Sequence, residues 1–145
     1  MRVTILGCGS SVGVPTLSSG WGACDPANPK NRRRRASILV ETGGKTILVD
    51  TSPDLREQLL AAGSPDIDAV LLTHGHADHT HGLDDLRPLH WRRGGPLPLY
   101  TDRATLTILR ERFRYMFERV PESPPHFEPP LTAHEIAPGP LAAFN

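Results

Sequence analysis

The stretch Thr73-His74-Gly75-His76-Ala77-Asp78-His79-Thr80-His81-Gly82 decides how the rest of the chain is interpreted. Clustered histidine and carboxylate side chains suit a borderline-soft divalent cation such as zinc. His74 and His76 are two residues apart, so in an extended turn they project to the same side and can hold one ion. Asp78 and His79 follow where the chain bends into a helix, and they can face a second ion. No cysteine lies nearby, which favours an open catalytic site over a thiolate-closed structural zinc.

The segments that precede this stretch predict strands and one helix. Residues 2–6, 37–41 and 46–49 are expected strands, and the turn at 42–45 contains the Gly-Gly pair that suits a hairpin. Ser52 is the expected N-cap of a helix that has Pro53 at its first position and ends at Gly63. Residues 67–73 form an apolar strand that runs directly into the histidines. Residues 7–35, rich in Gly, Pro, Ser and Asn, are expected to form a long functional or mobile loop.

The segments that follow predict further helices and one more strand. A short helix is expected over residues 82–87, ending near Pro88, and a strand over 97–100. Residues 102–117 carry apolar residues at helical spacing and predict a longer helix. Residues 121–145 are proline-rich and weakly patterned. Strands mixed with helices indicate an α/β class.

Composition limits the classes of function. The chain has 145 residues, with sixteen basic and sixteen acidic side chains, and therefore gives no overall electrostatic reason to bind nucleic acid or membranes. It shows no secretory signal and no stretch long enough to span a membrane. With only Cys8 and Cys24 no disulfide framework is indicated, so a cytoplasmic protein is expected, with Cys8 a small buried thiol.

One local concentration of charge stands out against this neutral balance. Arg32, Arg33, Arg34 and Arg35 are consecutive and follow closely on Lys30. The run is either a solvated basic loop or an anion site, because guanidinium groups offer forked donors that match phosphate oxygens.

The motif His-x-His-x-Asp-His after a buried strand resembles the hallmark of the metallo-β-lactamase superfamily. The resemblance implies an αββα sandwich with two divalent metal ions, zinc or else manganese, at one edge. It implies that His74 and His76 bind the first ion, and Asp78 and His79 the second, with Asp78 also orienting the attacking water. It further implies that Asp50, which ends the strand at Leu48-Val49, braces the metal loop.

Three other stretches are similar to the branch that hydrolyses phosphoribosyl 1,2-cyclic phosphate, which is itself similar to the tRNA 3′-processing endonucleases. They are residues 6–15, the basic segment 31–35 and residues 82–89. Some members of that branch hold a structural zinc through three cysteines in the first loop, but here that loop carries only Cys24. The resemblance covers the front portion of the family, so residues 1–145 are expected to be a partial domain. His126 and His134 lie in the later part of the chain, and neither has a recognisable ligand context.

The sequence therefore predicts a metal-dependent hydrolase acting on a small phosphodiester, with Arg34 and Arg35 as candidates for contacting the substrate phosphate. A nuclease of the tRNA-processing kind, a thioester hydrolase on the same scaffold and an inactive metal-binding fragment remain alternatives. The expected partner is a small molecule rather than a membrane or a nucleic acid, and self-association is a further expectation, because a partial domain exposes strand edges and apolar faces.

Overall fold

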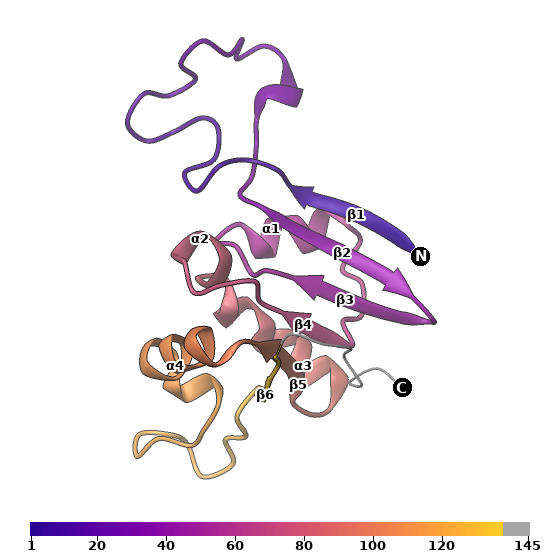
Figure 1. Cartoon of the computed structure of the whole chain (residues 1–145), viewed down its shortest axis with the longest axis vertical. Coiled ribbons are helices and arrows are strands. Elements are labelled where there is room, and N and C mark those ends of the chain that lie inside the picture. Colours follow the sequence, from indigo (N-terminus) through magenta and orange to yellow (C-terminus); the bar gives the residue numbers. More distant parts are fainter. Residues whose placement is uncertain (138–145) are drawn as a thin grey trace.

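The computed structural model describes residues 1–137 and contains one mixed sheet with helices packed against it (Figure 1). Its strands are β1 (Arg2–Gly7), β2 (Ser37–Thr42), β3 (Lys45–Val49), β4 (Ala69–Leu71), β5 (Leu97–Thr101) and β6 (Leu131–Glu135). Its α-helices are α1 (Leu55–Ala61), α2 (Ala77–Thr80), α3 (Arg87–Arg93) and α4 (Arg103–Arg112). Short 3-10 turns lie at Pro29–Asn31, Leu83–Leu86 and Arg114–Met116. The architecture confirms the predicted α/β class.

The order of the strands in the sheet follows their order in the chain. β1 pairs antiparallel with β2 and β2 with β3, whereas β3, β4, β5 and β6 run parallel. The short helix α2 follows β4 and lies at the end of the sheet toward which the β3 arrow points (Figure 1). The carboxyl ends of parallel strands are where α/β sheets place their binding sites. The predicted metal motif is therefore at the edge where a site is expected.

One face of the sheet is buried beneath the helices. Leu39, Leu48, Val70 and Leu99 lie opposite one another on successive strands and are at most 3% exposed. They share one hydrophobic core with side chains from the helices, which include Leu55, Leu59, Leu86 and Leu109. This shared core fixes the helices against the strands.

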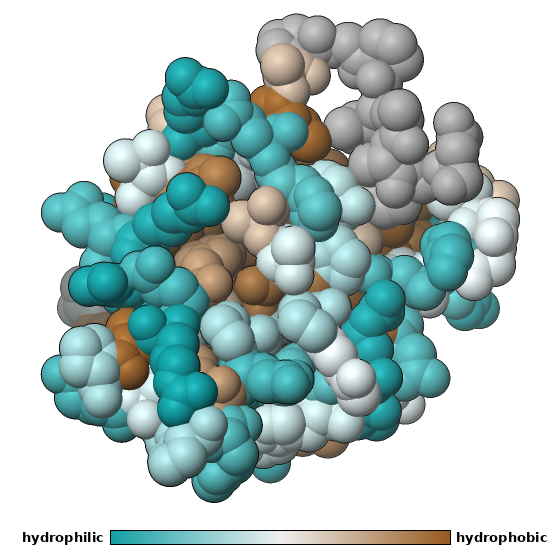
Figure 2. Space-filling view, turned by 90° about the horizontal axis from the view of Figure 1, so that it is seen from below, coloured by the Kyte–Doolittle hydropathy of each residue, from teal (hydrophilic) through white to brown (hydrophobic). Residues whose placement is uncertain are grey.

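The opposite face of the sheet is apolar but only partly covered. Val3 and Ile5 of β1 are 50% and 68% exposed. The half-buried side chains that continue this face across the neighbouring strands are Ile38, Val40, Ile47, Val49 and Leu71. Apolar residues also reach the surface among hydrophilic ones in the view of Figure 2. An open apolar face fits the predicted sandwich, in which a second sheet packs against the first.

The start of the first helix differs from the prediction. Ser52 does not cap α1, which begins at Leu55, but the backbone N–H of Leu55 donates to the Ser52 carbonyl at 2.9 Å. The Ser52 hydroxyl accepts from the N–H of Asp54 and donates to the side chain of Gln58 at 2.9 Å. Ser52 and Pro53 thus form a turn that leads into the helix.

The predicted helix end at Pro88 is wrong. Residues 83–86 form a 3-10 turn, and α3 continues through Pro88 to Arg93. Pro88 stands near the N-terminus of α3, where a missing N–H breaks no helical hydrogen bond, so it starts a helix instead of ending one. None of the helices in residues 1–137 is long and apolar enough to cross a membrane.

Gly82 lies where the chain segment before α1 meets the segment after α2. A Cβ atom at this position would stand 2.0 Å from the Ser52 carbonyl oxygen and 2.9 Å from the Leu55 Cβ. We expect Gly82→Ala to lower the free energy of unfolding by about 1–3 kcal/mol, because the backbone must shift to admit the methyl group. Urea unfolding measures this change. Gly95→Ala is the matched control, since nothing lies within 4 Å of its added Cβ, and equal losses in both variants would contradict the close approach.

Candidate metal centre

The histidine motif occupies the turn between β4 and α2. His74 follows the strand, His76 is the N-cap of α2, and Asp78 and His79 lie within the helix. The turn passes close to α4, because a Cβ on Gly75 would stand 2.9 Å from the Ile108 side chain. A larger residue there would require the Ile108 side chain to shift.

The predicted ligands lie close together. The ring of His74 is 4.6 Å from that of His76 and 4.1 Å from that of His79, between centroids. The Nε2 atom of His79 is 3.3 Å from a carboxylate oxygen of Asp78. His81, the fourth histidine of the stretch, instead packs edge-on against Phe113 at 5.4 Å. The side chains of His74, His76, Asp78 and His79 therefore lie close together, whereas the His81 ring packs against Phe113.

Asp50 connects the motif to the end of β3. Its side chain, in a residue only 6% exposed, accepts from the backbone N–H of Thr73 at 2.8 Å and contacts His79 Nδ1 at 2.7 Å. The contact with Nδ1 orients the ring, and Nε2 then faces Asp78, the other residue of its expected pair. These are the contacts expected of a brace, although its effect on metal binding stays a prediction.

Two threonines were not identified from the sequence. The Thr73 hydroxyl lies 2.9 Å from Nδ1 of His74 and within 3.0 Å of both Asp50 carboxylate oxygens. Thr51 donates its backbone N–H to the His79 carbonyl at 2.8 Å. Thr51 follows Asp50 and Thr73 precedes His74 in the sequence. Their position next to predicted site residues is the signal that could have identified them.

The donor chemistry fits divalent metal ions. Three imidazoles and one carboxylate are ligand types found in zinc sites, and His74 and His79 each have Nδ1 engaged by another side chain. Within residues 1–137, however, no three His, Cys, Asp or Glu side chains are placed to hold one ion. The division of the four ligands into two pairs stays a prediction. Each ion would need ligands in addition to these pairs.

The other candidate residues lie elsewhere. His134, on β6, stacks on Tyr100 at 4.8 Å, and His126 lines a separate groove with His90 and Trp91. Both cysteines are free and exposed, so the expectation of a buried Cys8 is wrong. Its Sγ accepts a hydrogen bond from Arg33 at 3.0 Å.

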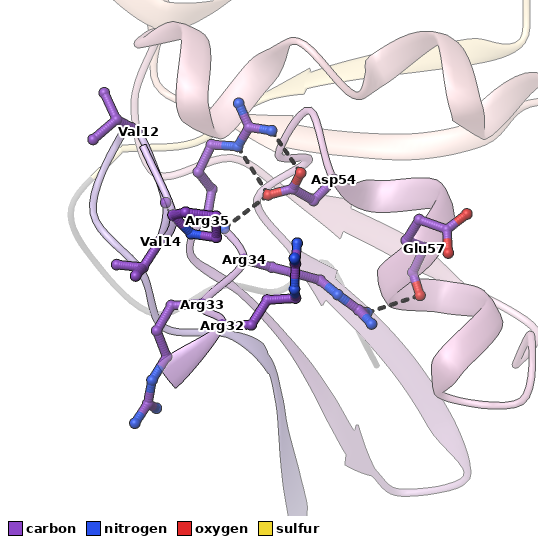
Figure 3. A pocket seen from close by; sticks show the side chains of 10 residues that line it. Val12, Val14, Arg32, Arg33, Arg34, Arg35, Asp54 and Glu57 are labelled. Atoms are coloured by element: carbon purple, nitrogen blue, oxygen red, sulfur yellow. Dashed lines mark hydrogen bonds and ion pairs between the residues drawn. The ribbon is translucent and has the colours of Figure 1, made fainter. Parts of the chain in front are cut away.

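Two arginines of the basic run contact the first turns of α1 and the residue before it (Figure 3). Arg35 forms a two-pronged ion pair with Asp54, with distances of 2.5 and 2.8 Å. Mainly through these hydrogen bonds, Arg35 lowers the pKa of the Asp54 carboxyl and Asp54 raises the pKa of the guanidinium. The Asp78 carboxylate adds the smallest of the contributions that raise the pKa of Arg35. Arg34 donates to the backbone carbonyl of Glu57 at 2.8 Å.

The sheet, the motif and its supporting contacts define a metallo-β-lactamase fold. A family described as "Beta-lactamase superfamily domain" matches residues 45–144, and the chain belongs to this superfamily.

The relatives differ in the activities that their names give. An octanoyltransferase from Porphyromonas gingivalis is 44% identical over 122 residues, which are 83% of this chain and 24% of that protein. The crystal structure of a diphosphatase from the PhnP family has a TM-score of 0.83 and 39% identity, and the match covers 98% of this chain and 52% of that one. Zinc-bound PqqB from Methylobacterium extorquens has a TM-score of 0.65 and 32% identity, covering 77% and 40%. The chain thus spans about half the length of the solved relatives that it matches, or less.

Proposed function

We propose that the protein to which this chain belongs is a cytoplasmic, metal-dependent hydrolase of phosphoric esters. A small cyclic phosphodiester, such as phosphoribosyl 1,2-cyclic phosphate, is the proposed substrate. The observation that carries the proposal is that residues 50–54 contact both the His/Asp motif and the arginine segment, since Asp50 contacts His79 and Asp54 pairs with Arg35. The diphosphatase relative, which also acts on a phosphorus centre, supports it.

His74 and His76 would hold one divalent ion, and Asp78 and His79 the other, with zinc the expected metal. Bound there, the ions would supply Lewis acidity toward phosphate oxygens and lower the pKa of water. Asp50 keeps the His79 ring oriented, and Thr73 does the same for His74. Asp78 stands beside Nε2 of His79, where it can orient the attacking water as well as bind metal.

The basic segment favours a phosphoric ester over a thioester as the substrate of this fold. A thioester carbonyl needs no array of guanidinium groups, whereas a phosphoric ester carries negative charge that arginine matches in shape and charge. An anionic substrate is therefore the better fit to the surroundings of the motif.

The test compares two lengths of the protein on two substrates. We expect this 145-residue chain to bind zinc weakly, because two protein ligands per ion leave most positions to water. A version that continues to the length of its relatives should retain two zinc ions after dialysis and hydrolyse bis(p-nitrophenyl) phosphate. Turnover of a thioester in preference to the phosphodiester would contradict the proposed substrate class. Two retained ions and full turnover in the short chain would contradict the need for further ligands.

A further inference from the structure

The helix α2, which carries Asp78 and His79, is too short to be stable by itself. It has four residues, and isolated helices shorter than about 12–15 residues are marginal in water. The backbone N–H of His79 donates to the His76 carbonyl at 3.1 Å. The N–H of His81 donates to the Ala77 carbonyl at 2.9 Å. Contacts from other parts of the chain must therefore fix the positions of the side chains on α2.

On one side, this support comes from the segment that follows β3. Asp50 contacts Thr73 and His79, and Thr51 donates its N–H to the His79 carbonyl. The Thr51 carbonyl also accepts from the N–H of Gly82 at 2.9 Å. These contacts reach residues 73, 79 and 82, so the turn between His74 and His76 depends on support from another element.

That support comes from α4 and the 3-10 turn after it. A Cβ on Gly75 would stand 2.9 Å from the Ile108 side chain, so the metal turn lies directly against α4. Nη1 of Arg112 donates to the Gly75 carbonyl at 3.3 Å. One residue further on, the Phe113 ring packs edge-on against the ring of His81. Three residues near the end of α4 thus contact both ends of the motif stretch.

A fourth contact lies just beyond the motif. The Tyr115 hydroxyl donates to the Asp84 carboxylate at 2.8 Å, and Asp84 belongs to the 3-10 turn Leu83–Leu86 that follows the motif stretch. Burial, and then the hydrogen bond to Asp84, raise the pKa of Tyr115 to about 12. The phenol therefore keeps its proton at neutral pH and remains a donor.

The residues that make these contacts are fixed to the core. Leu109 of α4 and Met116 are fully buried in the core that the sheet and the helices share. Phe113 and Tyr115 are partly buried and pack against the same core. Because residues 108–115 lie between buried anchors, they present a rigid surface to the metal turn. We call residues 108–115 the α4 clamp.

Arg112 makes the clamp contact nearest to the expected ligands. Gly75 stands between His74 and His76, and its carbonyl belongs to the peptide group that joins it to His76. Rotation of this peptide group changes the direction of the His76 side chain relative to that of His74. The hydrogen bond from Arg112 is long and exposed, so it adds little to the stability of the whole fold. Its effect is on the local orientation of the turn.

We propose that the α4 clamp positions the metal turn, with Arg112 and Tyr115 as its positioning residues. Arg112 holds the peptide group after Gly75, and Tyr115 holds the chain that leaves α2 through Asp84. The clamp gives the turn its shape before an ion arrives, so that metal binding has less chain to order. This inference rests on the proposed metal-dependent function.

The first experiment measures amide hydrogen exchange in the longer protein, in EDTA, so that no metal contributes. In Arg112→Ala, the amides of His79 and His81 should exchange about 2–10-fold faster, which corresponds to the loss of one net hydrogen bond. The amides of β2 and β3 should exchange at an unchanged rate, since the change is local. Arg112→Lys should restore most of the protection, because an ammonium group can donate to the same carbonyl. Arg110→Ala is the control, since it removes the same charge from an exposed position of the same helix.

Tyr115→Phe tests the other end of the clamp. The substitution keeps the ring that packs on the core and removes the hydroxyl that Asp84 accepts. It should raise the exchange rate of the His81 amide about 2–10-fold and leave β2 and β3 unchanged. Exchange in Arg112→Ala and Tyr115→Phe equal to that in Arg110→Ala would overturn the clamp.

The second experiment measures metal binding and turnover in the same variants. Arg112→Ala should lower zinc affinity by about 10-fold, at the lower end of the range for residues that support a ligand. It should also change the visible absorption spectrum of the cobalt-loaded protein, which reports the arrangement of ligands, and Arg112→Lys should restore that spectrum.

The outcomes separate the clamp from other roles of Arg112. Unchanged zinc affinity and cobalt spectrum, with a raised KM for bis(p-nitrophenyl) phosphate, would show that Arg112 contacts the substrate and would refute a positioning role. Faster exchange without any change in zinc affinity would also refute it. If exchange at His79 and His81 responds as expected but the unchanged protein binds no metal, the clamp stands and the proposed metal-dependent function fails.

Discussion

Replacing His76 with alanine should reduce turnover of a phosphodiester by more than about 100-fold in the longer protein. Replacing a residue that only orients a metal ligand typically lowers metal affinity or activity by about 10–100-fold, and replacing the ligand itself should lower them further. The same change should lower the zinc retained after dialysis by about one ion per chain. The physical reason is that His74 would be left as the sole member of its pair, and a single imidazole holds zinc weakly.

The control for this variant is His126→Ala, which removes an exposed imidazole outside the motif. It should leave both metal content and turnover unchanged. If His126→Ala lost metal as His76→Ala did, His126 would be a ligand, and the division of the motif into two pairs would be wrong.

Asp50→Asn should weaken zinc binding by about 10–100-fold, because the amide cannot supply the negative charge that supports the His79 ring. Asparagine is the informative replacement at this position. Asp50 has a φ of 62°, in the left-handed region, which asparagine tolerates better than alanine does. An alanine variant would therefore combine backbone strain with the loss of charge. Competition titration with a zinc-binding dye gives the affinity.

Asp66→Asn provides the matched control, since its carboxylate is 93% exposed and pairs with Arg92 on the surface. Thermal unfolding of both variants separates an effect on folding from one on metal. Unchanged zinc affinity in a folded Asp50→Asn variant would show that Asp50 positions the loop without tuning the metal.

The parts of the fold that could be predicted are those determined by local pattern. Three segments have alternating or continuous apolar residues between turn residues, namely 2–6, 46–49 and 97–100. All three form strands close to the expected bounds. Asp102 caps α4 by accepting from the N–H of Thr105, although the helix ends at Arg112 rather than Phe117. The motif itself predicted which side chains would meet, because ligand spacing is a short-range property of one turn.

The parts that could not be predicted depend on contacts distant in sequence. β6 has little pattern of its own and forms because it pairs in parallel with β5 along its length. The ion pair between Arg35 and Asp54 joins residues that no periodicity connects. The backbone conformation of the arginine run likewise depends on the pairing of residue 33 with residue 14, a non-local contact.

The sequential strand order of the sheet has a consequence for how the protein is made. Every strand pairs with the one synthesised immediately before it, so no strand has to wait for a partner encoded much later. On the ribosome, the sheet can therefore grow from β1 toward β6 as the chain emerges, since domains generally fold from the N-terminal side during synthesis. The histidine turn would be in place as soon as β4 and α2 have left the exit tunnel. Stalled nascent chains ending after residue 137 should accordingly already protect the amides of β2 and β3 from hydrogen exchange.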